Sequence, residues 1–210
     1  ANQGDALAQL QLGLMLSNGI GIEKNEQEAV TLFQKSADQG LSEGQYSLAV
    51  MYEHGLGVTQ NYVQAVKWYR LAADQNDAAA QLNLGIMYAN GTGASQDYAE
   101  AFALYRKVAD QGVAQAQYNL GNLYAEGRGV GQDYAEAFAW FSLAADQGFA
   151  LAQYNLGNLY SEGLGVPQDY AKALEWLSLA ADQNVMEAQY NLGNLYYEGK
   201  AVPQDYAQAF

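Results

Sequence analysis

The sequence predicts an all-α fold, a right-handed superhelical solenoid built from 36-residue helix-turn-helix repeats. The nonapeptide AQYNLGNLY occurs three times, at residues 116–124, 152–160 and 188–196, and the copies start 36 residues apart. A leucine recurs at the same interval without any insertion, at Leu12, Leu48, Leu84, Leu120, Leu156 and Leu192. A fixed period of about 20–50 residues is typical of proteins in which each repeat packs mainly against its neighbours.

The first helix of each repeat follows from the spacing of its apolar residues. In the fourth repeat, Ala116, Leu120 and Leu123 fall at intervals of four and three residues, which places them on one face of a helix. Gly127 ends this face, because glycine adopts the positive φ that follows many helix C-termini. We therefore expect a helix over about 113–125.

The second helix of the repeat shows the same spacing. Ala137, Phe141 and Ala144 lie on one face, and Trp140 extends it. The pattern predicts a helix over about 133–146.

Acidic residues stand where the second helices begin. Asp133 precedes Glu136 by three residues, and Asp97 precedes Glu100 in the same way. This is the spacing of an N-cap residue and its reciprocal partner in a capping box, so we expect these acids to be structural.

Small residues recur at fixed positions of both helices and predict close helix packing. On the first helix they are Gly13, Ala49, Gly85, Gly121, Gly157 and Gly193, and on the second they are Ala29, Ala65, Ala101, Ala137, Ala173 and Ala209.

The period also defines the domain. We expect one repeat domain over residues 1–210, and its repeats are 5–40, 41–76, 77–112, 113–148, 149–184 and a truncated copy at 185–210. Residues 1–4 resemble the ADQG that ends other repeats, so we interpret them as the tail of a preceding repeat. An interrupted solenoid exposes apolar faces at its ends, which predicts either an excised segment or self-association through the truncated ends.

Composition excludes several classes of function. The 210 residues carry a net charge of −14, and such a surface repels nucleic acid phosphates and anionic lipid headgroups. No apolar run is long enough for a membrane span, so no membrane insertion is expected. The chain has no cysteine, which excludes disulfides and thiolate metal sites.

No catalytic set can be assembled from the sequence, so we expect no enzyme, cofactor or metal. His54 is the only histidine, and we interpret it as a solvated residue at the end of a helix. GRGVG at 127–131 follows a helix and lacks the lysine of a phosphate loop, so we interpret it as a helix terminator.

The repeated motif is A-Q-Y-N-L-G-N-L-Y-x-E-G-x-G-V-x-Q-D-Y-A-x-A, followed by A-A-D-Q-G. It resembles the Sel1-like repeats, which are relatives of the tetratricopeptide repeats, over essentially the whole chain. The resemblance implies a non-catalytic adaptor that binds a peptide or partner protein on the concave face of its first helices. It also implies a bacterial protein, with a periplasmic or secreted location slightly favoured over a cytoplasmic one.

By the same resemblance, three positions of each first helix face the concave groove. Together with a glutamate that recurs at the end of these helices, they give the candidate binding residues Tyr118, Asn119, Asn122, Glu126, Tyr154, Asn155, Asn158, Glu162, Tyr190, Asn191, Asn194 and Glu198. Asparagine can bind a peptide backbone through both its carbonyl and its amide. The alternative interpretation is that Tyr-Asn-x-x-Asn is scaffold and that the glutamates form a solvated acidic rim.

The positions of the basic residues restrict the charge of the ligand that we expect. None of the nine basic residues lies on a predicted first helix. A groove without cations cannot hold a carboxylate through an ion pair, so we expect a neutral or basic protein or extended peptide. The leading hypothesis is an interaction scaffold. The alternatives are an envelope immunity protein that neutralises a secreted toxin and, less favoured, a hydrolase.

Overall fold

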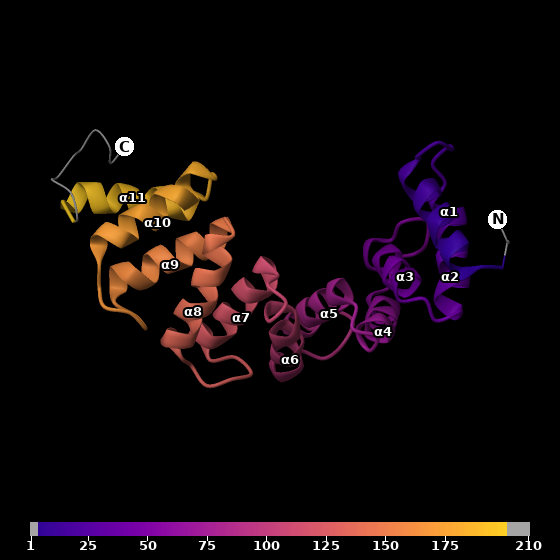
Figure 1. Cartoon of the computed structure of the whole chain (residues 1–210), viewed down its shortest axis with the longest axis horizontal. Coiled ribbons are helices and arrows are strands. Elements are labelled where there is room, and N and C mark those ends of the chain that lie inside the picture. Colours follow the sequence, from indigo (N-terminus) through magenta and orange to yellow (C-terminus); the bar gives the residue numbers. More distant parts are fainter. Residues whose placement is uncertain (1–3, 201–210) are drawn as a thin grey trace. The chain divides into compact units, whose positions relative to one another are not determined.

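The computed structural model describes residues 4–200, and these residues form only helices and their connections. The helices follow one another along the chain in consecutive pairs (Figure 1). Their bounds are α1 (Ala6–Asn18), α2 (Glu26–Asp38), α3 (Ser42–His54), α4 (Tyr62–Ala73), α5 (Ala78–Asn90), α6 (Tyr98–Ala109), α7 (Ala114–Glu126), α8 (Tyr134–Asp146), α9 (Ala150–Glu162), α10 (Tyr170–Asp182) and α11 (Met186–Glu198).

The predicted all-α repeat solenoid is confirmed. Each odd-numbered helix is the first helix of a repeat, and each even-numbered helix is the second. The two helices predicted in the fourth repeat are α7 and α8, and every predicted end lies within one residue of the observed one.

The chain forms two compact units, and the boundary between them falls within α6. One unit ends at Leu104 and the other begins at Tyr105. The description of residues 1–210 as a single repeat domain stays a prediction. The interrupted repeats predicted at residues 1–4 and 185–210 lie partly outside the described residues, as does Ala209.

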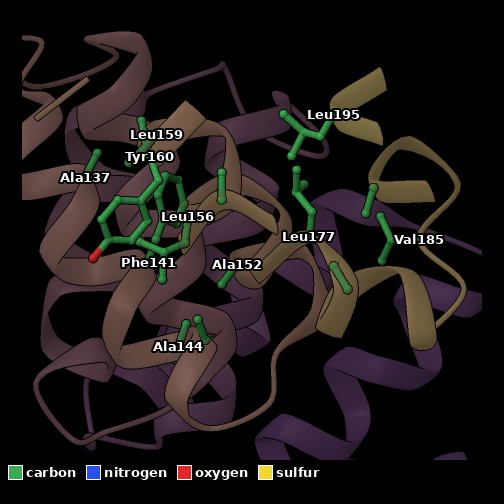
Figure 2. Packing of buried hydrophobic residues seen from close by; sticks show 14 residues of the cluster. Ala137, Phe141, Ala144, Ala152, Leu156, Leu159, Tyr160, Leu177, Val185 and Leu195 are labelled. Atoms are coloured by element: carbon green, nitrogen blue, oxygen red, sulfur yellow. The ribbon is translucent and has the colours of Figure 1, made fainter. Parts of the chain in front are cut away.

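The core of the second unit lies between successive helices. Phe141 from α8, Leu156 and Tyr160 from α9 and Leu177 from α10 belong to one buried cluster (Figure 2). The recurring leucine is at most 3% exposed at Leu48, Leu84, Leu120 and Leu156. Burying a leucine side chain stabilises a fold by about 1.5–3 kcal/mol, so this column contributes to the stability of these four repeats, whereas Leu12 of the first repeat is 40% exposed.

The small residues allow α1, α7 and α9 to lie close to the even helix of their own repeat. A Cβ on Gly121 would lie 2.7 Å from Cδ1 of Phe141, and one on Gly157 would lie 2.7 Å from Cγ of Leu177. The alanine column of the even helices is fully buried at Ala29, Ala65, Ala101, Ala137 and Ala173. Both sets of small residues therefore serve packing, as predicted.

A buried glutamine connects successive repeats, and the sequence analysis gave it no role. Gln153 of α9 is 5% exposed, and its Nε2 donates to the carbonyl of Ala145 in the preceding repeat at 3.3 Å. Its Oε1 accepts a hydrogen bond of 2.8 Å from Nε2 of Gln183, which follows α10. One side chain thus joins three helices. The same position holds the buried residues Gln9, Gln45, Gln81 and Gln117.

The connection between the two helices of a repeat is held by the Gln-Asp-Tyr sequence. Gln132 donates from Nε2 to the carbonyl of Ala125 at 2.8 Å and to the hydroxyl of Tyr134 at 3.1 Å. Asp133 caps α8 by accepting hydrogen bonds from the first turn of that helix. The predicted cap is present, but the backbone N–H of Asp133 donates to the carbonyl of Tyr124, not to the side chain of Glu136.

The two glycines of this connection have different tasks. The first, such as Gly127, ends the odd helix with φ 67° and donates to Leu123. The second, such as Gly165 with φ +69°, lies against the start of the even helix in the preceding repeat, where an added Cβ would overlap the Tyr134 carbonyl. Gly57 and Gly93 lie in the same way against Glu26 and Tyr62. The second glycine is therefore a contact between repeats.

We expect Gly165→Ala to destabilise the protein more than Gly148→Ala. Both glycines have positive φ, but a Cβ on Gly148 would meet nothing within 4 Å. The backbone strain alone costs roughly 1–2 kcal/mol, and the overlap at Gly165 should add about 1–3 kcal/mol. Urea unfolding of the two variants measures the difference, and equal destabilisation would show that the second glycine makes no close contact.

Candidate functional site

The predicted asparagines of the second unit hydrogen-bond to one another across successive repeats. Asn155 on α9 donates from Nδ2 to Oδ1 of Asn122 on α7 at 3.1 Å. Asn191 on α11 donates in the same way to Asn158 on α9 at 2.8 Å. We call these four side chains the asparagine ladder. They lie on the odd helices and are half-buried.

The ladder has two further asparagines at its ends. Asn119 lies three residues before Asn122 on α7, and Asn194 lies three residues after Asn191 on α11. Both are half-buried, and neither side-chain amide has a hydrogen-bond partner within residues 4–200. They keep the full capacity of an amide to donate and accept.

The three predicted tyrosines differ in how far they are committed to packing. The ring of Tyr118 lies 5.9 Å from that of Phe141 and 5.1 Å from that of Phe149, measured between centroids. Tyr154 is half-buried against the core cluster. Tyr190 is 71% exposed. The rings of Tyr118 and Tyr154 therefore take part in packing, whereas that of Tyr190 is accessible to a ligand.

The predicted glutamates are exposed at the ends of the odd helices, and two of them are paired with cations of the following loop. Arg128 lies 2.8 Å from Glu126, and Lys200 lies 2.7 Å from Glu198. The hydrogen bond that Lys200 donates to Glu198 raises the pKa of Lys200. Within residues 4–200, Glu162 forms no ion pair. Two of the three predicted glutamates are therefore engaged in ion pairs with neighbouring cations.

The first unit holds a polar cluster that the sequence analysis missed. Tyr69 on α4 is fully buried, and its hydroxyl donates to Oε2 of Glu53 at 2.6 Å. Asn83 on α5 donates to the same hydroxyl at 3.2 Å, and the ring of Tyr46 lies 5.7 Å from that of Tyr69. Burial and the bond to Glu53 both raise the pKa of Tyr69, so the phenol stays protonated.

Because of this cluster, the asparagine position has a different role in the first unit. Asn83 stands at the position of Asn119, Asn155 and Asn191, yet its amide is bound to a core tyrosine. The available signal was a tyrosine at Tyr69, and again at Tyr105, in a column that holds the apolar Phe33, Phe141 and Leu177 in the other repeats, because a buried hydroxyl requires a partner.

The residues weighed for catalysis lie at the ends of helices. His54 is exposed in the last turn of α3, and its Nε2 is 4.0 Å from Oε2 of Glu53. GRGVG includes the C-cap Gly127, which agrees with its interpretation as a helix terminator. Within residues 4–200, no three histidine or carboxylate side chains gather as metal ligands. In the same range, none of the helices has the length and apolar character needed to cross a bilayer.

Fold and site together define a helical-repeat protein whose repeats are joined by buried glutamines and by asparagines on the odd helices. The family model of the Sel1 repeat matches residues 6–41, 42–77, 78–113, 114–149, 150–185 and 187–210. The chain therefore belongs to the Sel1 repeat family, as its motifs predicted.

Solved structures with the same fold include close and distant relatives. The chain is 36% identical to a protective antigen present in uropathogenic Escherichia coli strains, with a TM-score of 0.92; the match covers 100% of this chain and 45% of the antigen. A Sel1 repeat protein from Oxalobacter formigenes is 33% identical, with a TM-score of 0.88 over 99% of this chain and 83% of that protein.

An immunity protein from Pseudomonas aeruginosa is more distant. It is 23% identical with a TM-score of 0.52, and the match covers 98% of this chain and 75% of that protein. Similarity at this level shows a shared fold alone. The comparison with curated proteins gives no match.

We expect Asn155→Ala to destabilise the protein and Asn119→Ala to leave it nearly unchanged. The first variant removes a hydrogen bond between repeats, at a cost of about 0.5–1.5 kcal/mol, whereas the second should stay within about 0.5 kcal/mol. Thermal and urea unfolding measure both. If the two variants were equally stable, the ladder would not contribute to the coupling of repeats.

Proposed function

We propose that this chain is a non-catalytic interaction scaffold whose odd helices in the second unit bind an extended peptide or partner protein. The Sel1 repeat fold is typical of protein–protein interaction. The observation that carries the proposal is the asparagine ladder with its two unpaired ends, Asn119 and Asn194.

The ladder offers an oriented set of polar groups. An asparagine side chain has two N–H donors and a carbonyl that accepts two hydrogen bonds. The bond between Asn155 and Asn122 uses one donor of the first and one acceptor position of the second. The remaining groups are held in place by that bond, so less conformational freedom is lost when a peptide backbone binds to them.

Charge favours a neutral or basic ligand. Within residues 4–200, the odd helices carry glutamates but no lysine or arginine. Glu162 follows Asn158 by one helical turn on α9 and forms no ion pair within residues 4–200, so it would attract a cationic flank, whereas Glu126 and Glu198 are already paired. Such long-range attraction affects association rate and specificity more than affinity.

The alternatives remain distinct from this proposal. An envelope immunity protein that neutralises a toxin would use the same scaffold, and immunity proteins from Pseudomonas aeruginosa share the fold. A hydrolase would require a nucleophile and a base in contact, and the exposed imidazole of His54 lies near a carboxylate, that of Glu53, at 4.0 Å. The interaction scaffold is the function that the geometry supports best.

We expect simultaneous Asn119→Ala, Asn155→Ala and Asn191→Ala to weaken peptide binding at least about tenfold, which corresponds to about 1.4 kcal/mol. The probe is a set of extended peptides selected on the wild-type protein from a random display library, and we expect them to be neutral or basic. Fluorescence anisotropy measures their affinity, and circular dichroism checks that the variant is folded.

The control variant carries Asp146→Ala and Asp182→Ala, two exposed changes on the even helices. It should bind the selected peptides as the wild type does. Undiminished binding by the asparagine variant would place the site elsewhere, and an excess of acidic sequences among the peptides whose binding that variant weakens would contradict the charge argument.

A further inference from the structure

The first unit has a groove along α4. Its volume is about 340 Å³. It is lined by Val63, Val66, Lys67, Arg70, Leu71 and Asp74 of α4 and its C-cap and by Gly93 of the loop that follows α5.

The residues of α4 that line the groove form one face of the helix. They recur at intervals of three and four residues, which is the spacing of a continuous stripe. The opposite face holds the buried residues Ala65, Trp68, Tyr69, Ala72 and Ala73. In the groove, Val63 is 64% exposed and Leu71 is 39% exposed. The helix therefore presents apolar area to solvent in addition to its core face.

Two positions of the groove, those of Val63 and Lys67, hold residues that no other described repeat has there, whereas Arg70 and Leu71 have counterparts in Arg106, Leu143 and Leu179. The position of Val63 is occupied in the other repeats by Gln27, Ala99, Ala135 and Ala171. The position of Lys67 is occupied by Thr31, Ala103, Ala139 and Glu175. An exposed valine is a poorer helix former than alanine or glutamine, so helix stability does not explain its presence.

Two cations border the apolar stripe. Nζ of Lys67 lies 5.1 Å from the centroid of the Trp68 ring, and the guanidinium of Arg70 lies 5.6 Å from that of Tyr88. Within residues 4–200, neither cation forms an ion pair. The rings orient the positive charges without neutralising them. Asp74 lies at one end of the groove, so the net charge of its lining is positive in a chain whose net charge is −14.

We propose that this groove is a second docking surface, and that its occupant is an amphipathic α-helix of another protein with acidic residues flanking its apolar stripe. A stripe along one helix is complementary to the apolar face of another, because ridges of side chains pack into grooves. Lys67 and Arg70 select for carboxylates beside that face. The proposal is independent of the peptide site on the odd helices.

Two synthetic peptides of about 18 residues test this proposal, a length at which isolated helices become populated. One carries leucines in a single helical stripe with glutamates on both flanks, and its sister has lysines in place of the glutamates. We expect the acidic peptide to bind and to gain helical circular dichroism signal. The basic peptide should bind at least about tenfold more weakly.

Substitutions on α4 test whether the acidic peptide binds in the groove. The single variant Val63→Asp and the double variant Lys67→Glu, Arg70→Glu should each bind the acidic peptide at least about tenfold more weakly than the wild type does. Leu143→Asp is the matched control, because Leu143 has the register of Leu71 in the fourth repeat and is 48% exposed. It should bind as the wild type does, and melting curves confirm that all variants are folded.

Several results would overturn the proposal: no binding of the acidic peptide, equal binding of both peptides, or binding that the α4 variants leave unchanged. Self-association of the chain that Val63→Asp abolishes would also overturn it, because the occupant would then be a second copy. Sedimentation of the wild type and this variant detects that outcome.

Discussion

The hydrogen bonds of the buried glutamine are the interaction on which the arrangement of successive repeats depends. An apolar contact is tolerant of small rotations, whereas a hydrogen bond fixes distance and direction. Gln153 binds the end of the preceding even helix and is bound by Gln183 from its own repeat. A one-residue shift would leave these buried polar groups unpaired, at a cost of about 1–3 kcal/mol for each group.

The proposed binding site follows from this fixed register. Because successive odd helices are held at a defined offset, Asn122 meets Asn155 and Asn158 meets Asn191. The second glycine of the loop, as at Gly165, adds a steric limit to the same offset. The repeats thus support one another, and the asparagine amides are oriented by the scaffold before any ligand is present.

Periodicity predicted the helices and their faces, because both depend on the spacing of side chains within one repeat. Leu120, Gly121 and Ala137 are buried as expected. Some hydrogen-bond partners lie in other repeats, and spacing within a repeat could not reveal these. The pairing of Asn122 with Asn155 and of Tyr69 with Asn83 was missed for this reason. Arg128 was assigned to a loop, but its position relative to Glu126 depends on the loop conformation.

The most direct test of this account is the free energy of unfolding of Gln153→Leu compared with that of Gln189→Leu. Leucine has a similar size but removes both buried hydrogen bonds of Gln153, to the Ala145 carbonyl and from Gln183, so the first variant should lose about 1–3 kcal/mol. Gln189 has the same register in the last repeat but is exposed, so its variant should change by no more than about 0.5 kcal/mol. Wild-type stability of Gln153→Leu would contradict the claim that these glutamines hold the repeats in register.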